Sequence, residues 1–307
     1  MRIAVVGAGA MGSIFGARLA GGGHDVVLVD VARPLVDRIN EAGVTVVRGD
    51  ESTTTRVPAT TDPSEIGPVD VVVFFVKCYH TSSATELARP LVGPDTVVAS
   101  LQNGWGNGDV LAATFPPEQV VVGVTYNSGL LVEPGKVVHP ADQPTLVGAF
   151  TDDGGDRPGR LAQALQGSGL EATVVSPVRP EIWKKLILNA ATLPTAALTG
   201  MNAGALTANE RMRDLVSETA REATAVARAL GYEIDAEERV DYIHALLEKA
   251  GLARGSMLQD FDANRRTEID VINGAVVGAA DEHAVHVPLN RAFVALVKGW
   301  ETMRGLS

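Results

Sequence analysis

The chain has little cysteine, no long apolar run and no excess of positive charge, and each shortage excludes a class of protein. Its 307 residues include one cysteine, Cys78, which excludes an intrachain disulfide framework and a cysteine-cluster metal site. No apolar run approaches the roughly 18 residues that cross a bilayer. The 26 basic residues face 37 acidic ones, a net charge of −11, which argues against nucleic acid as a partner. We therefore expect a cytoplasmic protein that acts on a small molecule, with no metal and no membrane or nucleic-acid partner.

The first 30 residues carry the pattern of a dinucleotide-binding unit. Ile3–Val6 is an apolar run typical of a buried strand, a G-x-G-x-x-G turn follows it, and a second run, Val26–Val29, ends in an acid. In this motif the glycines permit a tight turn, a close approach to pyrophosphate and close helix packing, and the phosphates lie at the helix N-terminus. An ordinary strand-to-helix turn is the alternative. We predict that the cofactor is bound by Gly7, Gly9, Ala10, Met11, Gly12 and Asp30.

Continuous apolar runs indicate strands buried on both faces of a parallel sheet. These runs are Ile3–Val6, Val26–Val29, Val71–Val76, Val97–Leu101 and Val120–Val124, with further strand-like pieces at Lys136–His139, Thr145–Phe150 and Ala172–Val175. We expect a Rossmann-type α/β domain with a doubly wound parallel sheet over residues 1–176. Ligands collect beyond the carboxyl ends of such strands. The residues that follow the runs therefore form one candidate site, comprising Gly7, Asp30, Lys77, Asn103 and Thr125.

After Pro177 the strand runs disappear and helical periodicity dominates. The expected helices are Glu181–Thr192, Ala208–Leu230, Ala236–Lys249, Glu268–His283 and Asn290–Met303. We predict an all-helical C-terminal domain over residues 177–307, with the substrate in the cleft between the two domains. Hydrophobic helices such as Ala208–Leu230 are compatible with a homodimer interface and equally with core packing.

One lysine lies at the edge of an apolar helix face. When Glu181–Leu193 is projected on a helix, Trp183 falls in the apolar sector and Lys185 at its edge, while Lys184 points to the opposite side. Asn189 follows one turn after Lys185. A lysine beside a half-buried tryptophan is partly desolvated, which lowers its pKa and suits it to donate a proton near neutral pH. A structural lysine with its ammonium in solvent is the alternative.

Two further segments have both an ordinary and a functional interpretation. Thr267 is spaced as a helix N-cap with Asp270 in the third position, so that Glu268 falls in the first turn and complements the helix dipole. Ser256 taken alone is also a helix cap. Neither pattern by itself distinguishes a site from a helix terminus.

Several motifs together resemble the ketopantoate reductase (2-dehydropantoate 2-reductase) family over nearly the whole chain. They are GAGAMG at 7–12, VKCYH at 76–80, QNGWGN at 102–107, EIWKKLILN at 181–189, SMLQD at 256–260, and RRTEID with VING at 265–274. The resemblance implies NAD(P)H-dependent reduction of ketopantoate to pantoate, with Lys185 as general acid. It implies that Glu268 contacts both substrate and cofactor as a catalytic residue, that Asn189 and Ser256 bind the substrate, and that Lys77 binds the cofactor. Asn103 is expected to contact both ligands.

The chain departs from the family at the cofactor. The family usually uses NADPH and places a basic residue just past the second strand, where this chain has Asp30 followed by Val31. A carboxylate accepts bonds from the ribose hydroxyls and repels a 2′-phosphate, so we predict a preference for NADH. NADPH is not excluded, because Arg33 lies only three residues further on.

A second departure concerns the substrate. The family commonly has asparagines at the positions of Leu193 and Ala253, which help to hold a hydroxylated substrate. Their replacement favours a more apolar, branched or aromatic 2-oxo acid, as an NAD-dependent D-2-hydroxyacid dehydrogenase would use. A β-hydroxyacid dehydrogenase would not explain the S-M-L-Q-D and T-E-I-D motifs. A non-catalytic, dinucleotide-binding regulatory protein would not need Lys185, Asn189, Ser256 and Glu268.

Overall fold

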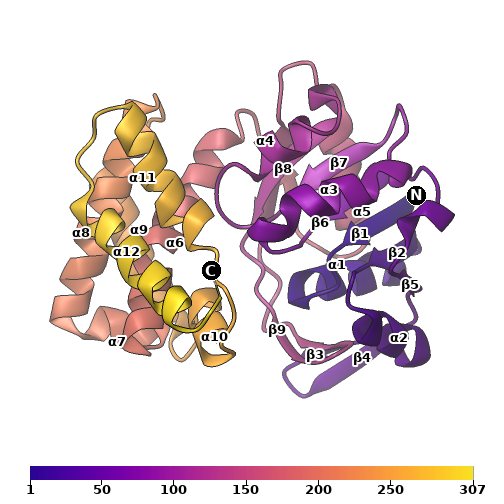
Figure 1. Ribbon diagram of the computed structural model, residues 1–307, viewed down its shortest axis with the longest axis horizontal. Coiled ribbons are helices and arrows are strands. Elements are labelled where there is room, and N and C mark those ends of the chain that lie inside the picture. Colours follow the sequence, from indigo (N-terminus) through magenta and orange to yellow (C-terminus); the bar gives the residue numbers. More distant parts are fainter. Residues whose placement is uncertain (307) are drawn as a thin grey trace. The chain divides into compact units, whose positions relative to one another are not determined.

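A computed structural model describes residues 1–306, and the chain divides into two compact units (Figure 1). The first consists of Met1–Gln102 and Asn107–Val178; the second consists of Asn103–Gly106 and the helical region from Arg179. The predicted boundary after residue 176 lies two residues before the division after Val178. The loop Asn103–Gly106 belongs to the second unit although its neighbours in sequence belong to the first, a feature that the sequence pattern did not predict.

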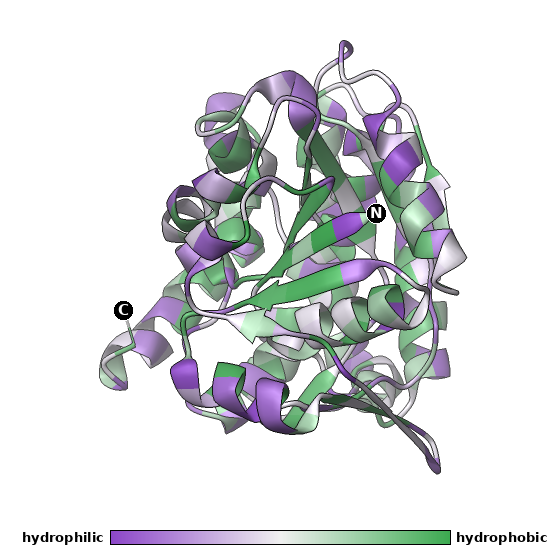
Figure 2. Cartoon of the chain, turned by 90° about the vertical axis from the view of Figure 1, so that its right-hand side faces the viewer, coloured by the Kyte–Doolittle hydropathy of each residue, from purple (hydrophilic) through white to green (hydrophobic). Residues whose placement is uncertain are grey.

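The first unit contains an eight-stranded sheet in the order β12-β11-β8-β7-β6-β1-β2-β5. Its strands are β1 (Arg2–Val6), β2 (Asp25–Val29), β5 (Ala59–Thr60), β6 (Val71–Phe74), β7 (Val97–Ser100), β8 (Val120–Thr125), β11 (Thr145–Ala149) and β12 (Ala172–Val174). Figure 2 shows these strands hydrophobic over most of their length, as expected for strands covered on both faces. The order reverses between β1 and β6, so the ligand-binding switch point lies beyond their carboxyl ends.

Two features of this unit differ from the prediction of one parallel sheet. Strand β11 runs antiparallel to β8, with Leu146 opposite Val124. The predicted strand at 136–139 lies in a separate four-stranded sheet, whose strands are β4 (Glu51–Thr55), β3 (Val44–Arg48), β10 (Lys136–Val138) and β9 (Leu130–Glu133). The chain leaves the large sheet after β8 to form β9 and β10 and returns as β11 in the opposite direction. Apolar composition reports burial and does not report strand direction, so the sequence could not show this reversal.

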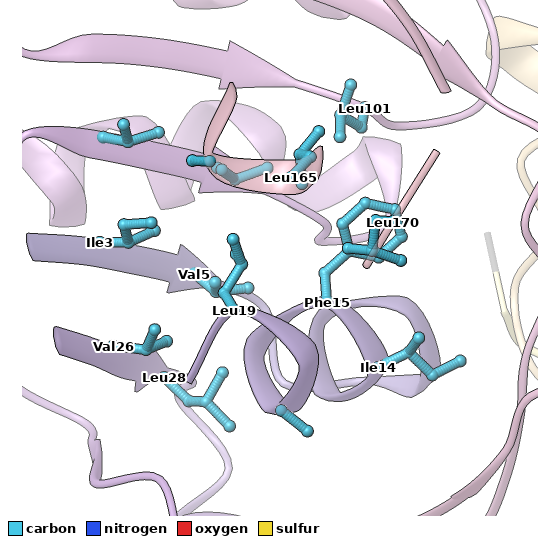
Figure 3. Packing of buried hydrophobic residues seen from close by; sticks show 14 of the residues in the cluster. Ile3, Val5, Ile14, Phe15, Leu19, Val26, Leu28, Leu101, Leu165 and Leu170 are labelled. Atoms are coloured by element: carbon cyan, nitrogen blue, oxygen red, sulfur yellow. The ribbon is translucent and has the colours of Figure 1, made fainter. Parts of the chain in front are cut away.

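The helices of the first unit cover the large sheet. They are α1 (Ala10–Gly21), α2 (Arg33–Ala42), α3 (Thr81–Ala88), α4 (Asn107–Ala112) and α5 (Arg157–Gly167), with short 3₁₀ turns at Pro63–Glu65, Cys78–His80, Arg89–Leu91 and Pro117–Gln119. Phe15 and Leu19 of α1 belong to one buried cluster with Val5 of the sheet and Leu165 of α5 (Figure 3). This core fixes the start of α1 against the end of β1, where the glycine-rich turn lies.

The second unit is helical, as predicted. Its helices are α6 (Arg179–Thr199), α7 (Ala203–Ala208), α8 (Glu210–Ala229), α9 (Ala236–Ala250), α10 (Ser256–Asp262), α11 (Asn273–Glu282) and α12 (Pro288–Met303), with a 3₁₀ turn at Ile269–Val271. Helix α6 packs against α8, α10 and α12. Within residues 1–306 no helix has the length and apolarity that a membrane span requires.

The two predicted helix caps differ from the structure in different ways. Thr267 Oγ1 does accept the Ile269 N–H at 3.2 Å, but the element that follows is the 3₁₀ turn Ile269–Val271, and the predicted helix α11 begins only at Asn273. The Thr267 N–H and Oγ1 also donate to Oε1 of the buried Glu301, at 2.8 and 2.7 Å. Ser256 is the first residue of α10, and Gly255 occupies the N-cap position. The local bond of Thr267 is therefore retained beside a tertiary contact, whereas the cap predicted at Ser256 is replaced by a neighbouring glycine.

Candidate active site

The glycine-rich turn after β1 has the geometry of a phosphate cradle. Gly7 has φ +98°, and a Cβ there would lie 2.7 Å from the Val76 nitrogen. A Cβ on Gly12 would collide with the carbonyl oxygen of Gly7. Gly9 differs, because no atom from another part of residues 1–306 lies within 4 Å of the position its Cβ would take. The open space over Gly9 fits a cofactor whose phosphates approach the backbone.

The start of α1 is suited to an anion. Gly9 is its N-cap residue, no side chain within residues 1–306 caps it, and the first turn, which includes Ala10 and Met11, carries no acid. The first N–H groups of a helix lack intrahelical partners and carry the positive end of its dipole. These residues, predicted to bind the cofactor, are therefore the ones that would hold its pyrophosphate.

Asp30 closes the glycine-rich turn from the end of β2. Its Oδ2 accepts a hydrogen bond from the Ala8 N–H at 2.8 Å, and its Oδ1 accepts one from the Ala32 N–H at 2.9 Å. A carboxylate has about four acceptor sites, so two backbone bonds leave it able to accept ribose hydroxyls. Val31 is 78% exposed. The side chain of Arg33, at the start of α2, donates to Thr61 Oγ1 at 2.9 Å.

Lys77 lies at the switch point, beside the glycine-rich turn. It is the residue before the 3₁₀ turn Cys78–His80, and it follows Val76, whose backbone packs against Gly7. Gln102 fixes this connection, because its Nε2 donates to the Val76 carbonyl at 2.8 Å and to Thr81 Oγ1 at 2.9 Å. Gln102 stands in a motif noted in the sequence, but nothing in its spacing revealed that it joins the ends of β6 and β7.

Thr125, at the end of β8, is buried and hydrogen-bonded within the first unit. Its Oγ1 lies in a buried polar network, where it accepts hydrogen bonds from Asn127 Nδ2 at 3.0 Å and Thr145 Oγ1 at 2.9 Å. The network continues to the fully buried His139 ring, 3.0 Å from Asn127 Oδ1. Thr125 is the last residue of β8 and pairs with Thr145 of β11, and its contact with a ligand stays a prediction.

In the second unit, the loop Asn103–Gly106 is held against the helices. Gly104 has φ +87° and lies so close to Val271 that a Cβ would contact it at 2.5 Å. The Trp105 N–H donates to the Val271 carbonyl at 2.9 Å, and the Trp105 ring lies 5.6 Å from that of Trp183. These contacts bring Asn103 to α6, where the Lys185 ammonium donates to Asn103 Oδ1 at 2.7 Å.

Lys185 has the electrostatics expected of a proton donor. Burial lowers its pKa to about 8, and the carboxylate of Glu268 opposes that shift. Glu268 is itself buried, with 7% of its surface exposed. Lys184 is instead paired with Glu181 at 2.7 Å. The two neighbouring lysines therefore lie in different environments, and only Lys185 joins an amide and a carboxylate predicted for the site.

Asn189 and Ser256 lie on two helices that pack together. Asn189 is buried one turn after Lys185 in α6, and Ser256 begins α10. Leu193, one further turn along α6, packs against Gly255, because a Cβ there would lie 2.9 Å from Leu193 Cδ2. An apolar side chain therefore lies beside the residue that precedes Ser256. Within the described residues no group of His, Cys, Asp and Glu is arranged to hold a metal ion.

A dinucleotide cradle at a topological switch point and a buried lysine with amide and carboxylate neighbours define a class of protein, the nicotinamide-dependent oxidoreductases. The family model described as "Ketopantoate reductase PanE/ApbA" matches residues 3–152, and its C-terminal counterpart matches residues 177–301. The chain therefore belongs to the ketopantoate reductase family, as its motifs predicted.

Curated relatives cover almost all of the chain. The 2-dehydropantoate 2-reductase of Halobacterium salinarum is 34% identical over 97% of this chain and 98% of its own length. That of Archaeoglobus fulgidus is 32% identical over 98% of each. The chain is accordingly an NAD(P)-dependent oxidoreductase, and not the non-catalytic protein considered as an alternative.

Solved structures of two enzymes with different named activities have the same fold as this chain. D-mandelate dehydrogenase with NADH and anilino(oxo)acetate has a TM-score of 0.94 and 28% identity, with both chains covered completely. The 2-dehydropantoate 2-reductase of Geobacter metallireducens has a TM-score of 0.92 and 29% identity, over 97% of this chain and 99% of its own. The predicted α/β fold with a helical C-terminal unit is confirmed.

Proposed function

We propose that the enzyme reduces 2-dehydropantoate (ketopantoate) to pantoate, with Lys185 as the general acid. The observation that carries the proposal is the Lys185 ammonium, which is partly buried, 2.7 Å from Asn103 Oδ1 and influenced by Glu268, with its pKa lowered to about 8. Relatives named 2-dehydropantoate 2-reductase at 30–34% identity support the choice of substrate.

Each residue of the set has a role in this reaction. The bound nicotinamide supplies the hydride that reduces the C2 carbonyl carbon. Lys185 donates a proton to the carbonyl oxygen as negative charge develops there, and its cationic charge stabilises that oxygen beforehand. Asn103 holds the ammonium in place. Ser256 binds the substrate carboxylate, Asn189 binds a second polar group, and Glu268 contacts substrate and cofactor.

The two adjacent lysines provide a matched test of this role. Lys185→Ala should lower kcat by about 10²- to 10⁴-fold, the usual contribution of a general acid, while the Kd for the cofactor stays unchanged. Lys184→Ala should keep kcat close to that of the wild type, because Lys184 pairs with Glu181 on a different side of α6. Steady-state rates with ketopantoate measure both. Near-normal turnover in Lys185→Ala would remove Lys185 from the role.

We infer further that NADH is preferred over NADPH. Asp30 presents a carboxylate beside the glycine-rich turn, and the exposed Val31 supplies no cation for a 2′-phosphate. The solved D-mandelate dehydrogenase, whose structure contains NADH, supports the ability of this fold to use that cofactor. Arg33 is the nearest candidate for a phosphate ligand, and its guanidinium already donates to Thr61.

A second function is favoured by Leu193. It contacts Gly255, the residue before Ser256, and neither Leu193 nor Ala253 has a polar side chain. A site of this kind favours a 2-oxo acid with a branched or aromatic side chain, because it has fewer groups to pair with a substrate hydroxyl. The similarity to D-mandelate dehydrogenase points the same way. The ratio of activities on the two kinds of substrate separates the two functions.

The proposal includes the cytoplasm as the location, where reduced nicotinamide cofactors are available, and a homodimer formed through the helical unit. Two large apolar side chains of α12 support an interface there, because Leu296 is 57% exposed and Met303 is 83% exposed.

A further inference from the structure

Helix α6 contains a proline in its interior, and this leaves one carbonyl without its helical partner. Pro194 has no N–H, so the carbonyl of Ala190, four residues earlier, receives no bond from the helix backbone. Ala190 is completely buried, so bulk solvent does not reach its carbonyl. A buried carbonyl without a partner is costly, so another group has to supply the hydrogen bond.

The missing donor comes from a side chain on a different helix. Asn273, the first residue of α11, donates from Nδ2 to the Ala190 carbonyl at 2.9 Å. The same Nδ2 donates to Asn290 Oδ1 at 3.0 Å. Asn273 and Asn290 are both completely buried. One amide nitrogen therefore uses both of its protons within the core of the helical unit.

The orientation of this amide is set by a carboxylate two steps away. Glu222 of α8 can only accept, and its Oε2 receives bonds from the N–H and the Nδ2 of Asn290, at 3.0 and 2.9 Å. Asn290 must therefore turn its Oδ1 toward Asn273, which then presents its Nδ2 to Asn290 and to Ala190. The helices α6, α8, α11 and α12 that pack together in Figure 1 are joined by this chain of bonds.

The hydrogen bond from Asn273 to the Ala190 carbonyl joins two segments, one that carries the proposed acid Lys185 and one that follows Glu268. Ala190 directly follows Asn189 in α6 and lies five residues after Lys185, while Asn273 lies five residues after Glu268. We propose that Asn273 is a positioning residue, which replaces the donor that Pro194 lacks and thereby sets α6 in register with the Glu268 segment. Its effect on catalysis rests on the proposed roles of Lys185 and Glu268.

The substitution Pro194→Ala provides a rescue test, because it returns an N–H to position 194. Asn273→Ala alone should lower kcat for the 2-oxo acid by about 10- to 100-fold, the scale of a misplaced catalytic group, and leave the Kd for NADH unchanged. In the Pro194→Ala background the same substitution should lower kcat only a few-fold. Equal losses of kcat in the two backgrounds would overturn the proposal, since the two residues would then act independently.

Amide hydrogen exchange gives a readout that does not depend on activity. Exchange across residues 186–193 should accelerate about tenfold in Asn273→Ala and return toward the wild-type rate in the double variant, because a buried carbonyl regains its donor. Faster exchange in Asn273→Ala that does not slow again in the double variant would overturn the proposal.

If Asn273→Ala alone does not fold, recovery of folded protein in the double variant supports the proposal, and failure to recover it contradicts the proposal. If exchange is rescued but Lys185→Ala keeps its turnover, the proposed function fails while the positioning of α6 stands.

Discussion

At the scale of single residues, the proposed chemistry depends on one lysine, Lys185, whose surroundings differ from those of its neighbour Lys184. Helical projection placed Lys185 and Lys184 on different sides of a helix, and the structure places the first beside Asn103 and Glu268 and the second beside Glu181. The projection could not show Asn103, because that residue is 82 positions away in sequence. Asn103 was a candidate because it follows a predicted strand and because of the family resemblance, but neither predicted its bond to Lys185.

The lowered pKa of Lys185 predicts how the reaction depends on pH. A general acid acts in its protonated form, and burial places the pKa of this ammonium at about 8 in the free enzyme. The value of kcat/KM for reduction should therefore be constant below pH 8 and fall about tenfold for each unit above it. Initial rates between pH 6 and about 10 measure the profile. A flat profile across that range would show that Lys185 does not limit the reaction as an acid.

Substitution of the exposed Val31 by a basic residue should change the cofactor preference. Val31→Arg adds a cation directly after Asp30 without disturbing the backbone bonds that Asp30 accepts. A charge-assisted bond to the 2′-phosphate should raise the ratio of kcat/KM for NADPH over NADH by about tenfold or more. Val31→Gln is the uncharged control and should leave the ratio nearly unchanged. A wild-type enzyme that already prefers NADPH strongly would contradict our interpretation of Asp30 and direct attention to Arg33.

At the scale of elements, the strands and helices with strong apolar patterns lie near their predicted positions, and the errors concern strand direction, sheet membership and element ends. The predicted runs Ile3–Val6 and Val26–Val29 end where β1 and β2 end, and the predicted run Val71–Val76 extends two residues past the end of β6. The helix predicted from residue 268 is instead a 3₁₀ turn followed by α11. Thr267 keeps its local bond to the Ile269 N–H but is also bonded to Glu301, more than 30 residues away, which a local capping pattern cannot show.

The hydrogen bonds between Glu301 and Thr267 should contribute measurably to the free energy of unfolding. Glu301 Oε1 accepts two hydrogen bonds from Thr267, and Glu301 Oε2 lies 3.1 Å from the Lys298 ammonium. Glu301→Gln keeps the shape but removes the buried charge, so it should lower the free energy of unfolding by about 1–3 kcal/mol. The exposed Glu282→Gln is the control and should change it by less than about 0.5 kcal/mol. Chemical denaturation measures the free energy of unfolding of both variants. Equal changes in Glu301→Gln and Glu282→Gln would show that Glu301 does not stabilise the segment that contains Thr267.

At the scale of the whole molecule, composition and periodicity predicted an α/β unit followed by a helical unit, and the structure has that arrangement. The sequence could not show that the loop Asn103–Gly106 belongs with the helices. That membership follows from contacts of Gly104 and Trp105 with Val271 and Trp183, which are distant in sequence. One consequence is that Asn103 reaches Lys185 within a single compact unit.

The proposed roles also bear on substrate selection by the whole enzyme, because a general acid at Lys185 would serve any 2-oxo acid, whereas Leu193 would discriminate among substrate side chains. The most direct test is kcat/KM of the wild-type enzyme for ketopantoate, 2-oxoisovalerate and phenylglyoxylate, followed by oxidation of NADH and of NADPH. We predict that ketopantoate gives the highest value and that NADH is the better cofactor. Reduction of phenylglyoxylate with no turnover of ketopantoate would assign the enzyme to the D-2-hydroxyacid dehydrogenases, and no turnover of any 2-oxo acid would contradict the account as a whole.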